Sequence, residues 1–252
     1  MTARILIIAG SDSGGGAGIQ ADIKTVTMLG GHAMTAITAI TAQNTLGVDA
    51  ILAIPPAMIT AQIDAVVNDL GVDAVKIGML GTRETIACVE AAVARLPQDV
   101  PVVVDPVLVA TSGASLSEAD TIPALHSLFS RATLVTPNLP ELEALGGEAA
   151  VLIHGCALLV KGGHAEGDRL TDRLVTASGT LAAWEDSRIA TRHTHGTGCT
   201  LASAIATGLG EGLPLEQAIA RARKFVRAAL RAAPGLGAGH GPMGHQAVRL
   251  TA

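Results

Sequence analysis

The chain has 252 residues, of which 49% are apolar and 15% are charged, with a formal net charge of −5. Two Phe, one Trp and no Tyr cannot furnish the stacking platform of single-stranded nucleic-acid binders, and no basic run suits duplex DNA. No apolar stretch approaches bilayer length, and the three cysteines match neither zinc spacing nor a disulfide framework. We therefore expect a cytoplasmic protein with neither a nucleic-acid nor a membrane partner.

Short β-branched runs alternate with helical stretches, and several runs are apolar on both faces. Such runs are typical of parallel strands covered by helices on both sides. The predicted strands are Ile5–Ala9, Met34–Thr41, Ala74–Ile77, Val102–Asp105, Thr133–Thr136 and Ala157–Lys161. The predicted helices between them are Gly18–Leu29, Ala57–Asp69, Thr82–Arg95 and Ser117–Ser130, the last with Ser117 as N-cap.

The C-terminal third begins with short strands and ends with helices. The strands are predicted at Thr171–Thr176, Thr180–Trp184 and Ser187–Arg192, with turns at Ser178-Gly179 and Glu185-Asp186; two helices follow, Gly198–Leu209 and Leu215–Ala233. Because no linker interrupts this order, we expect a single three-layer α/β domain over residues 1–252, with a mostly parallel sheet, helices on both faces and antiparallel edge strands. Ligands of such sheets bind beyond the carboxyl ends of the strands.

A glycine-rich segment, AGSDSGGGAGIQAD (9–22), joins the first strand to the first helix. Five glycines within nine residues, beginning at Gly10, let backbone amides approach a ligand closely, whereas a simple turn needs only one or two. The segment is neither a Walker A loop nor a GxGxxG loop. A GxGxxG does occur at Gly239, Gly241 and Gly244, but without a strand before it, so we exclude a dinucleotide site there.

Two polar residues close predicted strands. Gln43, in TAQNT (41–45), can offer a donor and an acceptor side by side, which complements a ring nitrogen next to an exocyclic amine; the alternative is an ordinary loop hydrogen bond. Lys161, in KGGH (161–164), can neutralise phosphoryl oxygens as a point charge. A solvent-exposed lysine at a strand end remains the alternative.

The segment THGTGCTLASA (194–204) carries the strongest chemical signal. Gly196 and Gly198 flank Thr197 just ahead of a helix, so free amides converge where the helix dipole is positive and can stabilise a transferring phosphoryl group. Cys199 lies in the first turn, where a lowered thiol pKa would let it accept a proton, although a buried structural cysteine is the alternative. For His195 we expect a structural hydrogen bond.

Oxygen donors follow two further strands. Asp105 ends the strand predicted at Val102–Asp105, and Asn138 with Glu141 follows the strand predicted at Thr133–Thr136. These side chains suit Mg²⁺ and its waters, and Asn138 can also cap the helix that follows.

Together these segments resemble the bacterial hydroxymethylpyrimidine/phosphomethylpyrimidine kinases of thiamine biosynthesis, within the ribokinase-like fold. The resemblance adds KIGML (76–80), VVDPV (103–107), TPNLPE (136–141) and GHGP (239–242), in family order and nearly end to end. It implies ATP- and Mg²⁺-dependent phosphorylation of 4-amino-5-hydroxymethyl-2-methylpyrimidine and then of its monophosphate. A pyridoxal or pyridoxine kinase on the same fold is the alternative. A non-catalytic metabolite-binding protein is disfavoured because Lys161, Cys199 and the glycines around Thr197 are all present.

The resemblance also implies residue roles. The residues implied to bind the pyrimidine are Gly10, Asp22, Gln43, Met79 and Val107. Phosphoryl transfer would use Lys161 and Cys199, with Gly196, Thr197 and Gly198 as the anion hole. ATP would be bound by Lys161, Asn138 and Thr197, and Mg²⁺, through waters, by Asn138, Glu141 and Asp105. By analogy with relatives we expect a homodimer. One departure is Leu142–Val160, which is shorter than is usual in the family, so we expect a trimmed peripheral helix beside an intact site.

Overall fold

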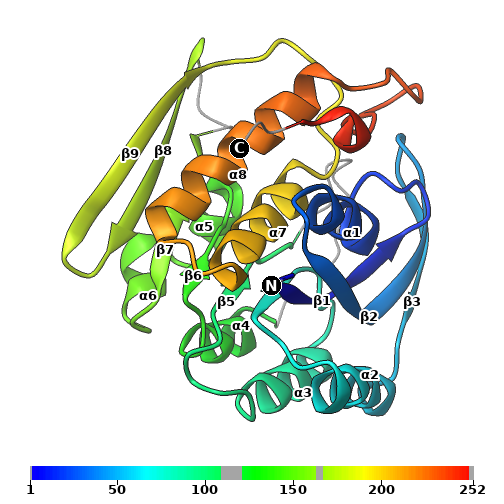
Figure 1. Ribbon diagram of the computed structural model, residues 1–252, viewed down its shortest axis with the longest axis vertical. Helices are drawn as coiled ribbons and strands as arrows, with labels where there is room; N and C mark the ends of the chain where they lie inside the picture. Colours follow the sequence, from blue (N-terminus) through cyan, green and yellow to red (C-terminus); the bar gives the residue numbers. More distant parts are fainter. Residues whose placement is uncertain (1, 109–120, 163–166, 250–252) are drawn as a thin grey trace.

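The computed structural model describes residues 2–108, 121–162 and 167–249, which are arranged around one nine-stranded sheet (Figure 1). The strand order is β3-β2-β1-β4-β5-β6-β7-β8-β9, in which β2, β1, β4, β5, β6 and β7 run parallel and β3, β8 and β9 run antiparallel to their neighbours. The expected mostly parallel sheet with antiparallel edge strands is thereby confirmed.

The element bounds are as follows. The strands are β1 Arg4–Asp12, β2 His32–Gln43, β3 Val48–Ala53, β4 Ala74–Ile77, β5 Val102–Val104, β6 Leu134–Val135, β7 Ala157–Val160, β8 Arg169–Thr176 and β9 Gly179–Ser187. The helices are α1 Gly18–Met28, α2 Pro56–Asp69, α3 Arg83–Val93, α4 Ile122–Phe129, α5 Leu139–Ala144, α6 Glu148–Leu152, α7 Thr197–Gly210 and α8 Leu215–Arg231, with a 3₁₀ turn at His245–Ala247.

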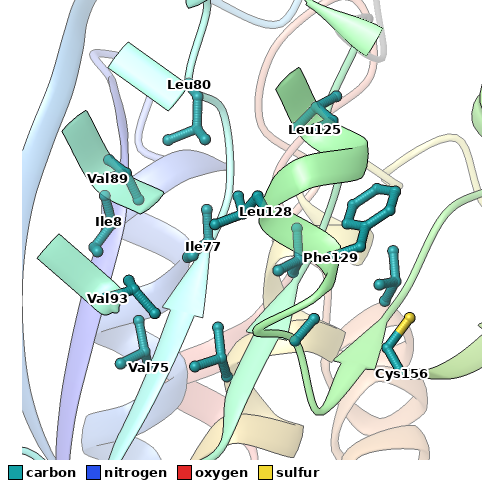
Figure 2. Packing of buried hydrophobic residues seen from close by; sticks show 14 of the residues in the cluster. Ile8, Val75, Ile77, Leu80, Val89, Val93, Leu125, Leu128, Phe129 and Cys156 are labelled. Atoms are coloured by element: carbon teal, nitrogen blue, oxygen red, sulfur yellow. The ribbon is translucent and has the colours of Figure 1, made fainter. Parts of the chain in front are cut away.

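The alternation of side chains along β1 builds two cores, one on each face of the sheet. Leu6 and Ile8 pack with buried residues of α2, α3 and α4, a cluster seen in Figure 2. Ile5 and Ile7 point the other way, toward α1, α7 and α8. Because successive strand residues face opposite sides, both faces must be apolar, which explains why the strands read as unbroken apolar runs. Phe129 is the one aromatic ring among the described residues of the first cluster.

The structure differs from the predicted elements at three places. Strand β3 was not foreseen, because most of its residues are exposed and it lacks the buried pattern of the others. Strand β9 runs through Glu185-Asp186 to Ser187, so the turn and the third strand predicted there are wrong. Helix α4 begins at Ile122, and the predicted cap Ser117 lies outside the described residues.

The shortened segment Leu142–Val160 holds the end of α5 and the five-residue α6. Val151 of α6 is fully buried in the first cluster, and Gly147 begins the helix at a φ of 87°. A short helix therefore covers this part of the sheet, as expected. No helix in the described ranges is long and apolar enough to cross a membrane.

The C-terminal turn contributes a buried histidine, which makes stability depend on pH. Burial, followed by the charge of Lys24, lowers the pKa of His245 to about 4, and its Nε2 lies 2.8 Å from Thr200 Oγ1. The unfolded chain binds this proton near the ordinary pKa of about 6.5, so the native state loses stability as the pH falls from there toward 4.

We predict that lowering the pH from 7 to 5 removes about 2 kcal/mol of unfolding free energy through this one residue. The His245→Gln variant should show a correspondingly flatter pH dependence, measured by denaturant unfolding monitored by circular dichroism. His32→Gln, at an exposed histidine, is the matched control and should leave the wild-type slope unchanged. Equal slopes for His245→Gln and the wild type would contradict the prediction.

Candidate active site

A single cavity of about 670 Å³ lies at the carboxyl ends of the parallel strands. β1, β2, β4, β5 and β7 each end at its wall, which agrees with the place expected for ligands of such a sheet. Every predicted site residue except Asp22 lines it: Gly10, Gln43, Met79, Asp105, Val107, Asn138, Glu141, Lys161, Gly196, Thr197, Gly198 and Cys199. Residues up to 189 positions apart in sequence thus face one space.

Asp12 organises the glycine-rich loop on one side of the cavity. Its carboxylate accepts hydrogen bonds from the amides of Gly14, Gly16 and Ala17 at 2.8–2.9 Å, and His195 Nε2 lies 2.9 Å away. Burial opposes ionisation, yet the bonds from His195 and the amides prevail and hold the pKa of Asp12 below its usual value. Sequence reasoning did not single out Asp12, although an acid inside a glycine-rich turn could have signalled it.

The wall beside this loop carries Gln43 and a small apolar group. The Gln43 amide lies 3.2 Å from Thr41 Oγ1 and 3.3 Å from His195 Nε2. Met79 and Val107 belong to a separate apolar cluster, and Met79 Sδ would lie 3.1 Å from a Cβ placed on Gly10. A polar amide therefore stands beside an apolar surface against which a flat ring can pack.

The start of α7 presents backbone amides to the cavity. Gly196 has a φ of 85°, and a Cβ there would lie 1.9 Å from the carbonyl oxygen of Gly16, so only glycine fits. The Thr197 amide donates to Thr194, whereas those of Gly198 and Cys199 have no partner among the described residues. Unpaired amides at a helix N-terminus form an anion site.

Cys199 differs from the sequence expectation. Burial raises the pKa of its thiol to about 12, with Lys76 opposing the rise and the carboxylates of Asp22 and Asp105 adding to it. The thiol pKa is thus raised where the sequence predicts a lowered one, because loss of hydration outweighs the helix terminus.

Acidic and basic side chains meet opposite the amides. Asp105 accepts from Thr136 Oγ1 at 3.0 Å and from Lys161 Nζ at 3.3 Å. Its other oxygen would lie 3.1 Å from a Cβ on Gly198, so no larger residue fits there without displacing it. Lys161 is not the solvent-exposed lysine that was its alternative interpretation, since only 15% of its side chain is exposed.

Glu141 and Asn138 form a capping box at the start of α5. Each side chain accepts a hydrogen bond of 2.8 Å from the other residue's amide. Burial and then the charge of Asp105, partly offset by Lys161, raise the pKa of Glu141 to about 7. Glu141 and Asp105 thus line the same cavity and repel one another. Within the described ranges no three His, Cys, Asp or Glu side chains are grouped to ligate a metal directly.

Asp22 is the predicted site residue that the structure sets apart. It is fully buried behind the cavity wall. One carboxylate oxygen accepts a hydrogen bond from Lys76 Nζ at 2.8 Å, and the other accepts one from Ser203 Oγ at 2.7 Å. Asp22 therefore does not line the cavity, as the pyrimidine-binding role expected of it would require, and its carboxylate bonds to protein partners instead.

The far end of the cavity carries charged residues that sequence reasoning missed. Arg223 of α8 bonds Asp172 at 2.7 Å and Asp186 at 2.8 Å, and its guanidinium lies 5.7 Å from the centre of the Trp184 ring. Asp172 also accepts the Gly162 amide at 2.8 Å, which fixes the backbone next to Lys161. No short motif marks these residues, so only the fold brings them together.

A family model described as phosphomethylpyrimidine kinase matches residues 12–244. The chain belongs to the phosphomethylpyrimidine kinase family. It is 48% identical over 262 aligned positions to the hydroxymethylpyrimidine/phosphomethylpyrimidine kinase of Rhizobium meliloti, covering 97% of each chain. It is also 48% identical to the thiamine biosynthesis bifunctional protein of Geobacter sulfurreducens, but it spans only about half (52%) of that longer protein.

Solved structures of two kinds of kinase share the fold of this chain. The ADP complex of Bacillus subtilis pyridoxal kinase aligns with a TM-score of 0.89 at 32% identity over the whole of both chains. A phosphomethylpyrimidine kinase from Clostridium difficile aligns with a TM-score of 0.76 at 36% identity, covering 90% of this chain and 98% of that one. The shape of the fold therefore does not separate the two substrate classes, whereas sequence identity favours the pyrimidine kinases.

Gly196 allows a test of the close approach between the start of α7 and Gly16, with a matched control. We predict that Gly196→Ala lowers the unfolding free energy by about 2–4 kcal/mol, because a left-handed backbone and a clash with Gly16 both act against it. Gly235 has a φ of 73° with nothing within 4 Å of its Cβ position, so Gly235→Ala should lose only about 1 kcal/mol. Denaturant unfolding measures both, and equal losses would contradict the close approach.

Proposed function

We propose that this chain, acting as one domain over residues 1–252, transfers the γ-phosphoryl group of ATP to 4-amino-5-hydroxymethyl-2-methylpyrimidine and then to the resulting monophosphate. Family membership and curated relatives matched over nearly their whole length support this activity. The observation that carries it is the shared cavity, which is lined by the Lys161 side chain, by Gln43 and by the start of α7 with its unpaired amides. We place the reaction in the cytoplasm, where ATP is available.

The pyrimidine end of the cavity follows from complementarity. We assign the aminopyrimidine to the space beside Gln43, whose amide can pair with a ring nitrogen and the exocyclic amine. The ring would lie against Met79 and Val107, with the Gly10 backbone leaving room for close approach. This arrangement turns the hydroxymethyl group toward the start of α7.

The phosphoryl end supplies charge and amides. The Gly198 and Cys199 amides would hold the equatorial oxygens, while Lys161 would offset charge on the transferring group. The substrate oxygen forms a bond to phosphorus as the bond to ADP breaks, and the hydroxyl proton passes to Cys199 in its thiolate form. Because the transition state of phosphoryl transfer is loose, the hydroxyl needs little activation before it attacks, and its proton moves after most of the bond to ADP has broken.

Mg²⁺ fits the donor set of this cavity. Glu141 and Asp105 line the same cavity, and burial and then the charge of Asp105 raise the pKa of Glu141. A divalent cation near both carboxylates would relieve their repulsion. Asp105, Glu141 and Asn138 would hold it through waters, since Asn138 and Glu141 already cap α5. The ion would supply charge neutralisation to the phosphates.

Purified protein with ATP and Mg²⁺ should release ADP with the pyrimidine alcohol and, in a separate reaction, with its monophosphate. Pyridoxal serves as the competing substrate because pyridoxal kinases share the fold. The proposal expects a higher kcat/KM for the pyrimidine, and Gln43→Ala should raise the pyrimidine KM. A clear preference for pyridoxal, or no ADP release with either pyrimidine, would overturn it.

The raised pKa of Glu141 makes magnesium use depend on pH. Below about pH 7 the carboxyl group is protonated and loses its attraction for the ion, so the Mg²⁺ concentration needed for half-maximal rate should rise as the pH falls. Glu141→Gln should require more Mg²⁺ above pH 7 and show little dependence below it. Glu143→Gln, at an exposed acid on the same helix, is the control. A pH-independent requirement in the wild type would refute this assignment.

We also propose a homodimer formed through the β2–β3 edge of the sheet. Ile40 and Leu52 are register partners on these strands, so their side chains share a face, and they are 48% and 64% exposed. Leu52→Glu should convert the dimer to monomers in light scattering coupled to gel filtration. Leu181→Glu, at a similarly exposed leucine on β9, should leave the dimer intact. A dimer that survives Leu52→Glu would exclude this interface.

A further inference from the structure

Lys76 is a fully buried lysine in the middle of β4. Its Nζ lies 2.8 Å from Asp22 Oδ2 on α1, and Ser203 Oγ on α7 donates to Asp22 Oδ1 at 2.7 Å. None of the three side chains lines the cavity, and all are completely excluded from solvent. The three residues form a hydrogen-bonded chain, the Lys76–Asp22–Ser203 chain, that joins the centre of the sheet to two helices.

The surroundings are shaped around the lysine head group. A Cβ on Gly78 would lie 2.7 Å from Lys76 Nζ, so the glycine two residues on leaves the space that the ammonium group fills. Two buried charges lose hydration, and well-packed apolar residues commonly hold neighbouring elements together at no loss of stability. Packing alone therefore does not account for a charged pair here.

Cys199 lies one helical turn before Ser203 on α7, and residues four apart share a helix face. The face that carries Ser203 to Asp22 therefore also carries the Cys199 sulfur. The charges that act on the Cys199 thiol are those of Lys76 on β4, Asp22 on α1 and Asp105 after β5. Of these charges, only that of Lys76 favours the thiolate.

We propose that the Lys76–Asp22–Ser203 chain sets the reactivity of Cys199, with Lys76 promoting the thiolate and Asp22 restraining it. Lys76 and Asp22 are positioning residues, since they act through Cys199 and touch neither substrate nor ATP. The catalytic consequence rests on the proposed function, in which Cys199 receives the hydroxyl proton. The electrostatic claim stands by itself, because it concerns the thiol in the protein without substrate.

The test is the rate at which iodoacetamide alkylates Cys199, followed over pH 7–10 by peptide-resolved mass spectrometry. The thiolate sulfur forms a bond to the methylene carbon and iodide leaves, so the rate at a given pH reports the thiolate fraction. Each unit by which the thiol pKa changes alters that rate about tenfold. Lys76→Met should slow alkylation by about tenfold, and Asp22→Asn should be faster than the wild type.

Controls separate electrostatics from loosened structure. Cys88, on α3, is an internal standard whose rate should stay the same in every variant. Arg4→Met and Asp73→Asn apply the same substitution classes to an ion pair near the amino end of β1, and should leave the Cys199 rate unchanged. The double variant Lys76→Met/Asp22→Asn leaves no buried charge unpaired, and its rate should fall between those of the single variants.

The signs decide the outcome. A structural role predicts that both single variants expose Cys199 and raise its rate together, and that result would overturn the proposal, as would equal rates in the two variants. If a single variant fails to fold, as judged by circular dichroism, the double variant replaces it. A double-variant rate below that of the wild type supports Lys76 as the stronger charge, and a rate at or above that of the wild type would overturn the proposal.

Activity measurements distinguish this inference from the proposed function. In the kinase assay Lys76→Met should lower kcat while the pyrimidine KM stays within about twofold. Absence of pyrimidine phosphorylation in the wild type would remove the proposed function and leave the alkylation result standing. Phosphorylation with alkylation rates that do not respond to Lys76 would remove the inference alone.

Discussion

The contact on which the site depends is the buried bond between Asp12 and His195, residues 183 positions apart. Asp12 folds the glycine-rich loop around its carboxylate, and His195 is followed directly by the Gly196 that begins α7. The loop and the helix start therefore cannot shift independently. A Cβ on Gly16 would lie 2.4 Å from the His195 ring, so the two glycine-rich segments meet with almost no space between them.

Much of the fold followed from the sequence because its parallel strands are short and apolar on both faces. Ala74–Ile77 was predicted at its observed bounds, and α1 was predicted to within a residue of its end. Strand β3 escaped, since it pairs through its backbone at an edge while its side chains stay exposed. The glycines of the C-terminal GxGxxG have a packing role: Gly239 and Gly244 let the chain pass against the carbonyl oxygens of Thr45 and Ala232, where a Cβ would lie 2.0 Å away.

Gln43, Asp105 and Lys161 were found because each lies where a parallel strand ends, and strand ends converge at one edge of the sheet. The segment 196–199 was found from its glycines ahead of a helix. What remained hidden depends on three-dimensional neighbours. Burial of Cys199 reverses the effect expected from its place in the helix, and the partners of Asp22 come from β4 and α7. Arg223 and Asp172 reach the cavity from α8 and β8, elements that carry no recognisable motif.

The undivided cavity has a stereochemical consequence. Because one space is bordered by the glycine-rich loop, the α7 amides and the Arg223 end, the donor and acceptor of the proposed reaction can occupy it together. No covalent phosphoenzyme is then needed to carry the group between separate pockets. A single in-line displacement inverts the configuration at phosphorus, so a chirally labelled γ-phosphoryl group would arrive on the alcohol with its handedness reversed.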